Sequence, residues 1–347
     1  MNKEKLKKRI AASAKRIPAD LVIKGGRIID VFNLRIIEAD VAICDGLIVG
    51  IGEYSGKEEM DATGQYIAPA FIDAHVHIES SMASPREFAK IVLPHGVTTV
   101  ITDPHEIANV SGTEGISFML ENSEGLDLDV FVMLPSSVPA TSFENAGAVL
   151  NDVDLRPFYS HPRVLGLAEV MDFPAVRDRD EDMIAKIFTA LDRGKQIDGH
   201  CAGLDVDAIN IYRAAGIRTD HESVAKEEID MKISRGMYVL IREGTTTRNL
   251  AELLPMVTPY NARRFMFCTD DKEIDQLLEE GSIDYNVRLA VQLGMDPLQA
   301  IQLASLNAAE CYGLKTKGAV APGYVADLLF LDDLHSVKIA KVMKNGK

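Results

Sequence analysis

Two histidines separated by one residue, His75 and His77, follow an apolar run within residues 67–79 and could bind a metal ion. The run is rich in β-branched residues and predicts a buried strand, in which side chains two positions apart point to the same face. Two imidazoles on one face suit a divalent transition metal. Asp73 shares that face, where a carboxylate can orient a histidine or hold the end of the strand. Such a pair also occurs where a strand simply meets solvent. Whether this pair binds a metal must therefore be judged from the rest of the chain.

Other residues of metal-ligand type stand at the ends of separate apolar segments further along the chain. They are His105, Glu169, His200, His221 and Asp270. Together with the first pair they are sufficient to hold two divalent ions a few Å apart, with one carboxylate bridging and one opposite. Glu169 is the most informative of them, because a carboxylate within GLAEVM is costly to bury unless it is paired or bound to metal.

Asp270 has a close rival in Asp271, since the sequence alone does not fix which of two adjacent side chains faces the site. We favour Asp270 as the member of the site. We expect Asp271 to cap the segment that follows.

The elements that would position these residues form an alternating pattern. Eight apolar segments are separated by helical stretches, at residues 67–79, 97–106, 129–139, 163–172, 196–203, 217–223, 237–244 and 264–271. Eight such units predict an α/β fold with a parallel (β/α)8 TIM-type barrel, whose active sites lie at the C-terminal ends of the strands. The candidate ligands fall at those ends.

The two ends of the chain have a different pattern. Residues 1–20 predict an exposed basic helix that ends before Pro18. Residues 21–66 and 317–347 both read as short alternating strands with glycine-rich turns. We therefore expect one small composite β-sandwich domain built from both ends, with the metal-dependent hydrolase barrel, residues 67–316, inserted in it.

Composition excludes several classes of protein. The chain has 347 residues, of which 47% are hydrophobic, and a formal net charge of −15, which argues against a nucleic-acid-binding surface. No apolar stretch is long enough for a secretory signal or a membrane span, so we expect a cytoplasmic protein without membrane contact. The four cysteines are far apart and form no CxxC pair, which predicts reduced thiols and no thiolate zinc site.

Six segments carry a resemblance to a known family. TDPHEIANV, GLAEVMD, DGHCAG, TDHES, REGTT and CTDD resemble the adenine deaminases of the amidohydrolase superfamily, of the type with a dinuclear metal centre. The resemblance covers nearly the entire chain. It implies hydrolytic conversion of adenine to hypoxanthine and ammonia in purine salvage. It also implies two divalent metal ions, with Mn²⁺ or Fe²⁺ preferred and Zn²⁺ possible.

The resemblance also implies roles for individual residues. His75 and His77 match ligands of one metal, Glu169 the bridging carboxylate, His200 and His221 ligands of the second metal, and Asp270 the carboxylate that binds metal and handles protons. Glu169, His221 and Asp270 thereby take catalytic positions. His105 matches a position near the substrate or the metal. Glu106, Arg242 and Glu243 are candidates for binding the purine edge, although each could equally be a salt-bridge residue at the rim.

Several alternatives stay open. Cyclic amidases resemble this layout but generally use a carboxylated lysine as the bridge, where this chain offers Glu169. Amino-sugar deacetylases can use a glutamate there, and the DPHE and REGTT segments disfavour them. His77 and Glu79 match half of the cytidine-deaminase signature, but its cysteine pair is missing.

The family usually continues into a further C-terminal domain, whereas this chain stops at KNGK. A truncated, inactive form, or a metal-dependent structural protein, is therefore an alternative to an enzyme. Barrels of this class often associate, so we expect a homo-oligomer.

Overall fold

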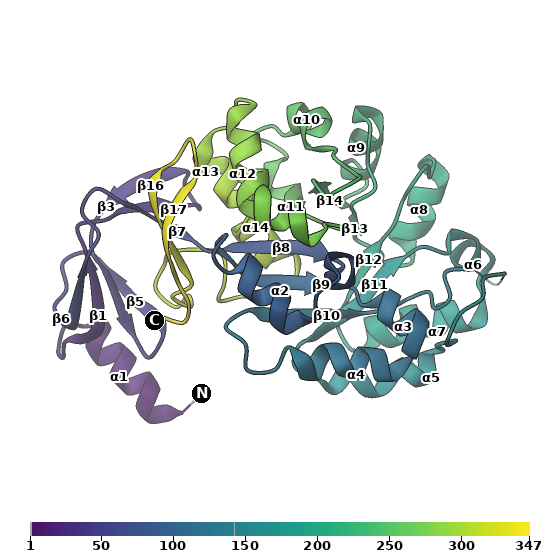
Figure 1. Ribbon diagram of the computed structural model, residues 1–347, viewed down its shortest axis with the longest axis horizontal. Coiled ribbons are helices and arrows are strands. Elements are labelled where there is room, and N and C mark those ends of the chain that lie inside the picture. The colour runs from purple at the N-terminus through teal and green to yellow at the C-terminus, as the bar shows by residue number, and fades with distance from the viewer. Residues whose placement is uncertain (1, 142) are drawn as a thin grey trace. The chain divides into compact units, whose positions relative to one another are not determined.

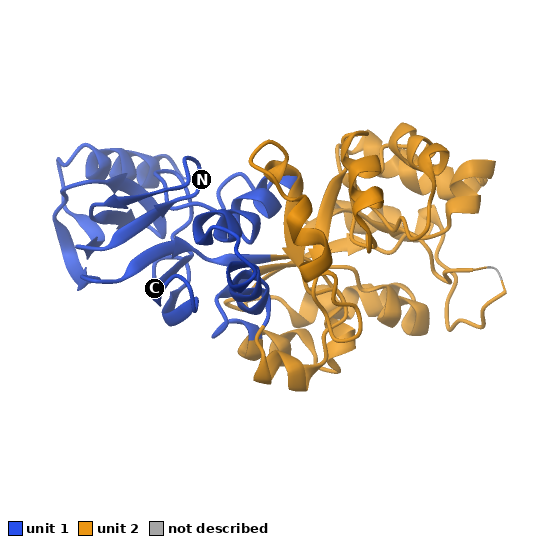
Figure 2. Cartoon of the chain, turned by 90° about the horizontal axis from the view of Figure 1, so that it is seen from above, with its two compact units in different colours: residues 1–72, 92–98, 282–347 blue, residues 73–91, 99–281 orange. Residues whose placement is uncertain are grey.

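The computed structural model describes residues 2–141 and 143–347. The chain divides into two compact units (Figures 1 and 2). Unit 1 comprises residues 1–72, 92–98 and 282–347, and unit 2 comprises residues 73–91 and 99–281. None of the helices in the described ranges is long and apolar enough to cross a membrane.

Unit 1 contains two β sheets that share one core. The first sheet has the order β5-β4-β1-β6, with strands β1 (Ala19–Lys24), β4 (Val41–Cys44), β5 (Leu47–Ile51) and β6 (Gly56–Asp61). The second has the order β17-β16-β7-β2-β3, with strands β2 (Arg27–Asp30), β3 (Arg35–Glu38), β7 (Tyr66–Pro69), β16 (Leu328–Asp333) and β17 (Lys338–Met343). Ile43 of the first sheet and Phe330 of the second are buried in the same apolar cluster. Strands from both ends of the chain therefore build this region together, as the sequence predicted.

The helix predicted over residues 1–20 spans only Lys3–Ser13, and strand β1 begins at Ala19. The basic helix α1 (Lys3–Ser13) begins after Asn2, whose side chain accepts the N–H of Glu4 and so caps the first turn. Before β16 the chain forms the helices α12 (Ile283–Gln292), α13 (Pro297–Leu303) and α14 (Leu306–Cys311).

Unit 2 contains the parallel strands. A five-stranded sheet has the order β12-β11-β10-β9-β8, with strands β8 (Phe71–Val76), β9 (Val97–Thr102), β10 (Asp129–Leu134), β11 (Val164–Val170) and β12 (Gln196–Gly199). A three-stranded sheet has the order β13-β14-β15, with strands β13 (Thr219–Asp220), β14 (Tyr238–Arg242) and β15 (Phe265–Cys268). The strands pair in parallel from β9 to β12 and again from β13 to β15. The first residues of β8 and β9 belong to unit 1.

Helices follow the strands and cover the sheets. They are η1 (Ile78–Ser81), α2 (Pro85–Val92), α3 (His105–Ser111), α4 (Thr113–Asn122), α5 (Asp152–Leu155), η2 (Arg156–Ser160), α6 (Phe173–Asp178), α7 (Glu181–Asp192), α8 (Val206–Ala214), α9 (Lys226–Ile233), α10 (Leu250–Leu253), η3 (Leu254–Met256), η4 (Ala262–Arg264) and α11 (Ile274–Glu279). Figure 1 shows α4, α7 and α8 beside the five-stranded sheet. Their residues Ile116, Ile187 and Ile209 share a buried apolar cluster with Val132 and Leu167 of the strands.

The expected closed barrel is present only in part. All eight predicted strands occur, but over the described residues they form two sheets and not one continuous ring. One break lies between β12 and β13, where Thr219 Oγ accepts the N–H of Gly199 and an Asp220 oxygen accepts the N–H of Cys201. At this break, side-chain oxygens therefore accept two backbone N–H groups that would donate to backbone carbonyl oxygens in a continuous sheet.

A second correction concerns the strand expected over residues 67–79. It is divided into β7 and β8, which belong to different sheets. The chain changes partner at Ala70, whose N–H donates to Asp327 O, while the N–H of Phe71 donates to Gly96 O. All four cysteines are buried.

Candidate metal centre

The predicted ligands meet where parallel strands of unit 2 end. His75 lies near the end of β8 and Asp270 lies just beyond β15, and their backbones are hydrogen-bonded from Asp270 N to His75 O at 3.0 Å. The N–H of His77 returns the bond to Asp270 O at 3.1 Å. Asp270 has φ of 59°, a left-handed conformation that aspartate tolerates better than most residues. This exchange fixes the three residues side by side.

Three of these side chains direct their ligand atoms to one point. Nε2 of His75 and Nε2 of His77 are 3.0 Å apart, and Asp270 Oδ1 lies 3.3 Å from each. Ligand atoms around a tetrahedral ion with bonds of about 2.1 Å lie about 3.4 Å from one another. The three atoms therefore have the mutual spacing that ligands of a divalent ion require, and the donor set fits a metal.

Glu169, at the end of β11, connects this group to a second one. Its Oε1 lies 3.4 Å from His77 Nε2, while its Oε2 lies 2.7 Å from His200 Nδ1 and 3.1 Å from His221 Nε2. One carboxylate thus faces His77 with one oxygen and both His200 and His221 with the other, as a bridging ligand would. His75, His77, Glu169, His221 and Asp270 are buried, and His200 is partly exposed.

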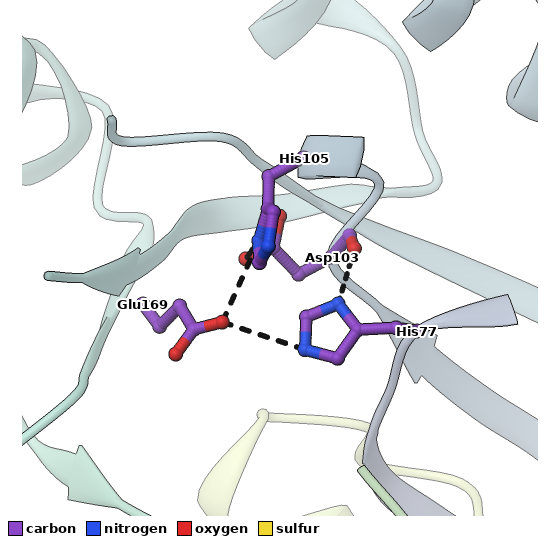
Figure 3. Close-up of side chains that lie close together, drawn as sticks. All are labelled: His77, Asp103, His105 and Glu169. Atoms are coloured by element: carbon purple, nitrogen blue, oxygen red, sulfur yellow. Dashed lines mark hydrogen bonds and ion pairs between the residues drawn. The ribbon is translucent and has the colours of Figure 1, made fainter. Parts of the chain in front are cut away.

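A further acidic group lies beside His77. His77 Nδ1 is 3.0 Å from the backbone oxygen of Asp103, which suits an N–H donor there and leaves Nε2 free for a metal. His105, at the start of α3, lies 3.0 Å from Asp103 Oδ2 and 3.5 Å from Glu169 Oε1 (Figure 3). Glu106 Oε1 is 3.4 Å from His77 Nδ1. His105 and Glu106 therefore both border the centre.

The electrostatics of the cluster favour ionised carboxylates. Burial alone would raise the pKa of Glu169, but His221 and His200 outweigh it and hold that pKa well below its ordinary value. Burial lowers the pKa of His221, yet Glu169 outweighs this effect and raises it to about 9. Burial likewise opposes ionisation of Asp270, and His75 and His77 overcome it, so that its pKa is lowered. Buried carboxylates in this state need positive charge nearby, which divalent ions would supply.

The remaining predicted residues divide into two groups. Arg242 belongs to the centre, because its Nη1 donates to Asp270 Oδ2 at 2.8 Å. Glu243 does not contact the predicted ligands through any bond that the described residues show; its carboxylate accepts the N–H of Leu250 at 3.2 Å. Asp73 holds the strand end, because its carboxylate accepts from both the backbone N–H and the hydroxyl of Thr269.

The expectation that Asp271 caps the following segment is wrong. Asp271 accepts a hydrogen bond from the Ser80 hydroxyl, and the N-cap residue of α11 is Glu273. Asp270 is the residue whose carboxylate lies beside His75 and His77.

Two residues of the centre were missed from the sequence. Glu222 binds Arg242 through both of its oxygens and lies 3.4 Å from His221 Nε2. Asp103 orients His105. Each had a usable signal, since Glu222 directly follows His221 and Asp103 stands two residues before His105 at the end of β9.

A family model described as "Amidohydrolase family" matches residues 66–347. The chain belongs to the amidohydrolase family. It is 59% identical over 342 residues to a protein of Geobacillus kaustophilus named adenine deaminase, and the match covers 99% of this chain and 59% of that protein. It is 58% identical to the adenine deaminase of Bacillus subtilis, covering 100% of this chain and 60% of that protein. The chain thus spans about 60% of the length of these curated relatives.

Two solved hydrolase structures share the fold of this chain at low identity. The atrazine chlorohydrolase of Arthrobacter aurescens, complexed with zinc, has a TM-score of 0.67 at 18% identity, covering 94% of this chain and 94% of that one. The β-aspartyl dipeptidase of Fervidobacterium islandicum has a TM-score of 0.67 at 17% identity, covering 94% of this chain and 95% of that one. Both likenesses support the mixed α/β architecture with a parallel sheet.

Proposed function

We propose that this chain carries the catalytic centre of an adenine deaminase, which converts adenine and water to hypoxanthine and ammonia. The choice of adenine as the substrate rests on the identity of 58–59% to proteins named adenine deaminase over almost the whole chain. The convergence of four imidazoles and two carboxylates in unit 2 supports hydrolytic chemistry at a metal centre.

Two divalent ions fit the donor set. His75, His77 and Asp270 would hold one ion, His200 and His221 the other, and Glu169 would bridge them. Bound ions of this kind lower the pKa of water and supply a nucleophile near neutral pH. The resemblance to adenine deaminases makes Mn²⁺ or Fe²⁺ our first choice. Zn²⁺ is the alternative, because imidazole and carboxylate ligands do not separate these metals. Zinc accompanies the related fold of the atrazine chlorohydrolase.

Asp270 is the proposed proton carrier. One of its oxygens faces the imidazoles of His75 and His77, and the other is held by Arg242. When the C6–O bond forms, Asp270 would accept the proton of the nucleophile. It would return that proton to a ring nitrogen or to the departing amine as the C6–N bond breaks. His105, Glu106 and Arg242 border the centre and remain candidates for binding the purine edge.

We also propose that the two parallel sheets belong to one (β/α)8 barrel over residues 67–316. Backbone hydrogen bonds cross both breaks, from Arg218 to Ile197 and between His77 and Asp270, and they support this arrangement. Residues 1–20 would then be an N-terminal segment that contains helix α1, and residues 21–66 with 317–347 a composite β domain. We also propose that the protein is cytoplasmic and forms a homo-oligomer.

The test is ammonia release from adenine by the chain reconstituted with Mn²⁺, alongside adenosine, cytosine, a cyclic amide and an N-acetylated amino sugar. Release from adenine alone, lost in Glu169→Gln, is the expected result. Glu121→Gln is the matched control, because Glu121 is an exposed residue of α4. Release from the cyclic amide or the amino sugar would favour those reactions. Two bound ions without release from any substrate would contradict deamination by this chain.

A further inference from the structure

Two candidate ligands, His200 and His221, lie on opposite sides of a break between the sheets of unit 2. His200 follows β12 and His221 follows β13, and these strands belong to different sheets. The backbone bond from Arg218 N to Ile197 O lies before the two histidines. The spacing of the histidines must therefore depend on contacts other than a continuous ladder.

Asp220 supplies one such contact. It is fully buried, precedes His221, and accepts the N–H of Cys201, the residue after His200, through Oδ1 at 2.9 Å. A single carboxylate thus joins the two segments that carry the histidines. Thr219 adds a parallel connection, because its hydroxyl donates to Asp198 Oδ1 at 2.8 Å.

Lys232 of α9 holds this carboxylate in place. Its side chain is 0% exposed, and Nζ donates to Asp220 Oδ2 at 2.7 Å and to Ser223 Oγ at 2.9 Å. The Ser223 hydroxyl in turn donates to Asp220 Oδ2 at 2.7 Å. A buried ion pair is weak evidence for stability, since apolar residues of similar volume often serve as well. The pair of Asp220 and Lys232 therefore calls for another explanation.

The other break has a related arrangement. There Asp73 accepts the N–H of Thr269 across the gap between two strands. One is β8, which carries His75, and the other is β15, which precedes Asp270. In both places a buried aspartate accepts a backbone N–H from the segment that bears a candidate ligand. At the break between β12 and β13, the buried Lys232 also contacts the aspartate.

We propose that Asp220, Ser223 and Lys232, here called the seam triad, are positioning residues that set the spacing of His200 and His221. The triad would thereby determine the affinity of the ion that these histidines hold. This inference rests on the metal centre of the proposed function. It concerns residues that touch neither the substrate nor the ion.

The first test compares the parent chain with Lys232→Met by titration of Mn²⁺ and elemental analysis, with circular dichroism to follow folding. Loss of a partner behind a metal ligand typically weakens metal affinity about 10- to 100-fold. We expect this loss for one of the two ions, with the affinity of the other unchanged. Parent affinity for both ions in the folded variant would overturn the inference.

Lys344→Met is the matched control. Lys344 Nζ donates to Asp327 Oδ2 at 2.7 Å, so this change also breaks a buried lysine–aspartate pair, but in unit 1, which holds none of the six candidate ligands. Its metal affinities should equal those of the parent. Equal weakening in both variants would show that the effect is general and would overturn the inference.

Two further variants cover the case in which Lys232→Met does not fold. Asp220→Asn combined with Lys232→Met removes both charges and keeps an oxygen that can accept from Cys201. Ser223→Ala keeps both charges and removes only the bridging hydroxyl. Weaker binding of one ion in either folded variant supports positioning, and parent affinities in both overturn it. If the parent itself binds fewer than two ions, the proposed centre fails and the inference fails with it.

Discussion

Arg242 Nη1 donates to Asp270 Oδ2 at 2.8 Å, and this bond leaves Asp270 Oδ1 facing Nε2 of His75 and of His77 at 3.3 Å. Both partners of the bond are buried. Burial would lower the pKa of Arg242, but Asp270 and Glu222 outweigh it and raise that pKa further, so the guanidinium stays charged. The arginine therefore fixes which oxygen of Asp270 faces the two histidines.

Arg242→Lys should reduce the rate of ammonia release while the protein stays folded. Lysine keeps the charge but loses the planar fork that reaches Asp270 and Glu222 together. We expect a fall in kcat of about 10- to 100-fold, the usual cost of losing support behind a metal-site ligand. Steady-state kinetics with adenine measure it, and Arg248→Lys, at a partly exposed position, is the control. An unchanged kcat would mean that charge alone suffices at this position.

The grouping of the candidate ligands could be predicted from the sequence because parallel strands bring their C-terminal ends to one edge. His75, Glu169, His200 and His221 stand at such ends, so recognising the strands was sufficient to group them. It was harder to predict which of the adjacent residues Asp270 and Asp271 faces the cluster. Asp270 faces the cluster with φ of 59°, a backbone conformation that strand periodicity does not predict.

The parts that the sequence did not predict depend on side chains that replace backbone hydrogen bonds. Thr219 and Asp220 accept N–H groups across the break between β12 and β13, and no periodicity distinguishes such residues from ordinary strand residues. The division between β7 and β8 is of the same kind. An apolar run of residues looks continuous whether or not the chain changes partner within it.

Gly244→Ala should disturb the segment that carries Asp270. A Cβ at this position would lie 2.5 Å from Asp271 O and 2.6 Å from Thr269 O, and both are backbone atoms that cannot rotate away. The segment must shift, so we expect weaker metal binding and lower kcat with only a modest change in melting temperature. Thr246→Ala, an exposed position in the same loop, is the control. Parent metal content in Gly244→Ala would show that the segment adapts without moving Asp270.

Removing metal should lower the stability of the folded chain. An ion that binds only the native state at a concentration of 100 Kd adds about 2.7 kcal/mol to the free energy of unfolding for each site. A chelated sample should therefore unfold at lower urea concentration and recover when Mn²⁺ is added. The variant with His75→Ala and His77→Ala should gain less from the ion. Equal unfolding curves with and without Mn²⁺ would argue against a metal centre built from these residues.

Asp327 should make the stability of the chain depend on pH in the acid range. Its carboxylate is buried with Lys344 Nζ at 2.7 Å and Lys317 Nζ at 2.8 Å. Burial would raise its pKa, but the two lysines outweigh burial and lower it. Because the folded state holds this proton less tightly, the stabilisation is complete above the ordinary carboxyl pKa of about 3.9 and is lost as pH falls through the lowered value.

Asp327→Asn should therefore cost about 3–5 kcal/mol of unfolding free energy at neutral pH, because it leaves buried charge without its partner. The difference from the parent should shrink as the pH drops below about 3.9, since the parent carboxylate is then protonated as well. Urea unfolding at a series of pH values measures this difference. Asp332→Asn is the control, because the ion pair of Asp332 with Lys338 is exposed and its change should matter little at any pH. A difference for Asp327→Asn that stays constant down to acid pH would show that lost packing, and not the ion pair, causes the destabilisation.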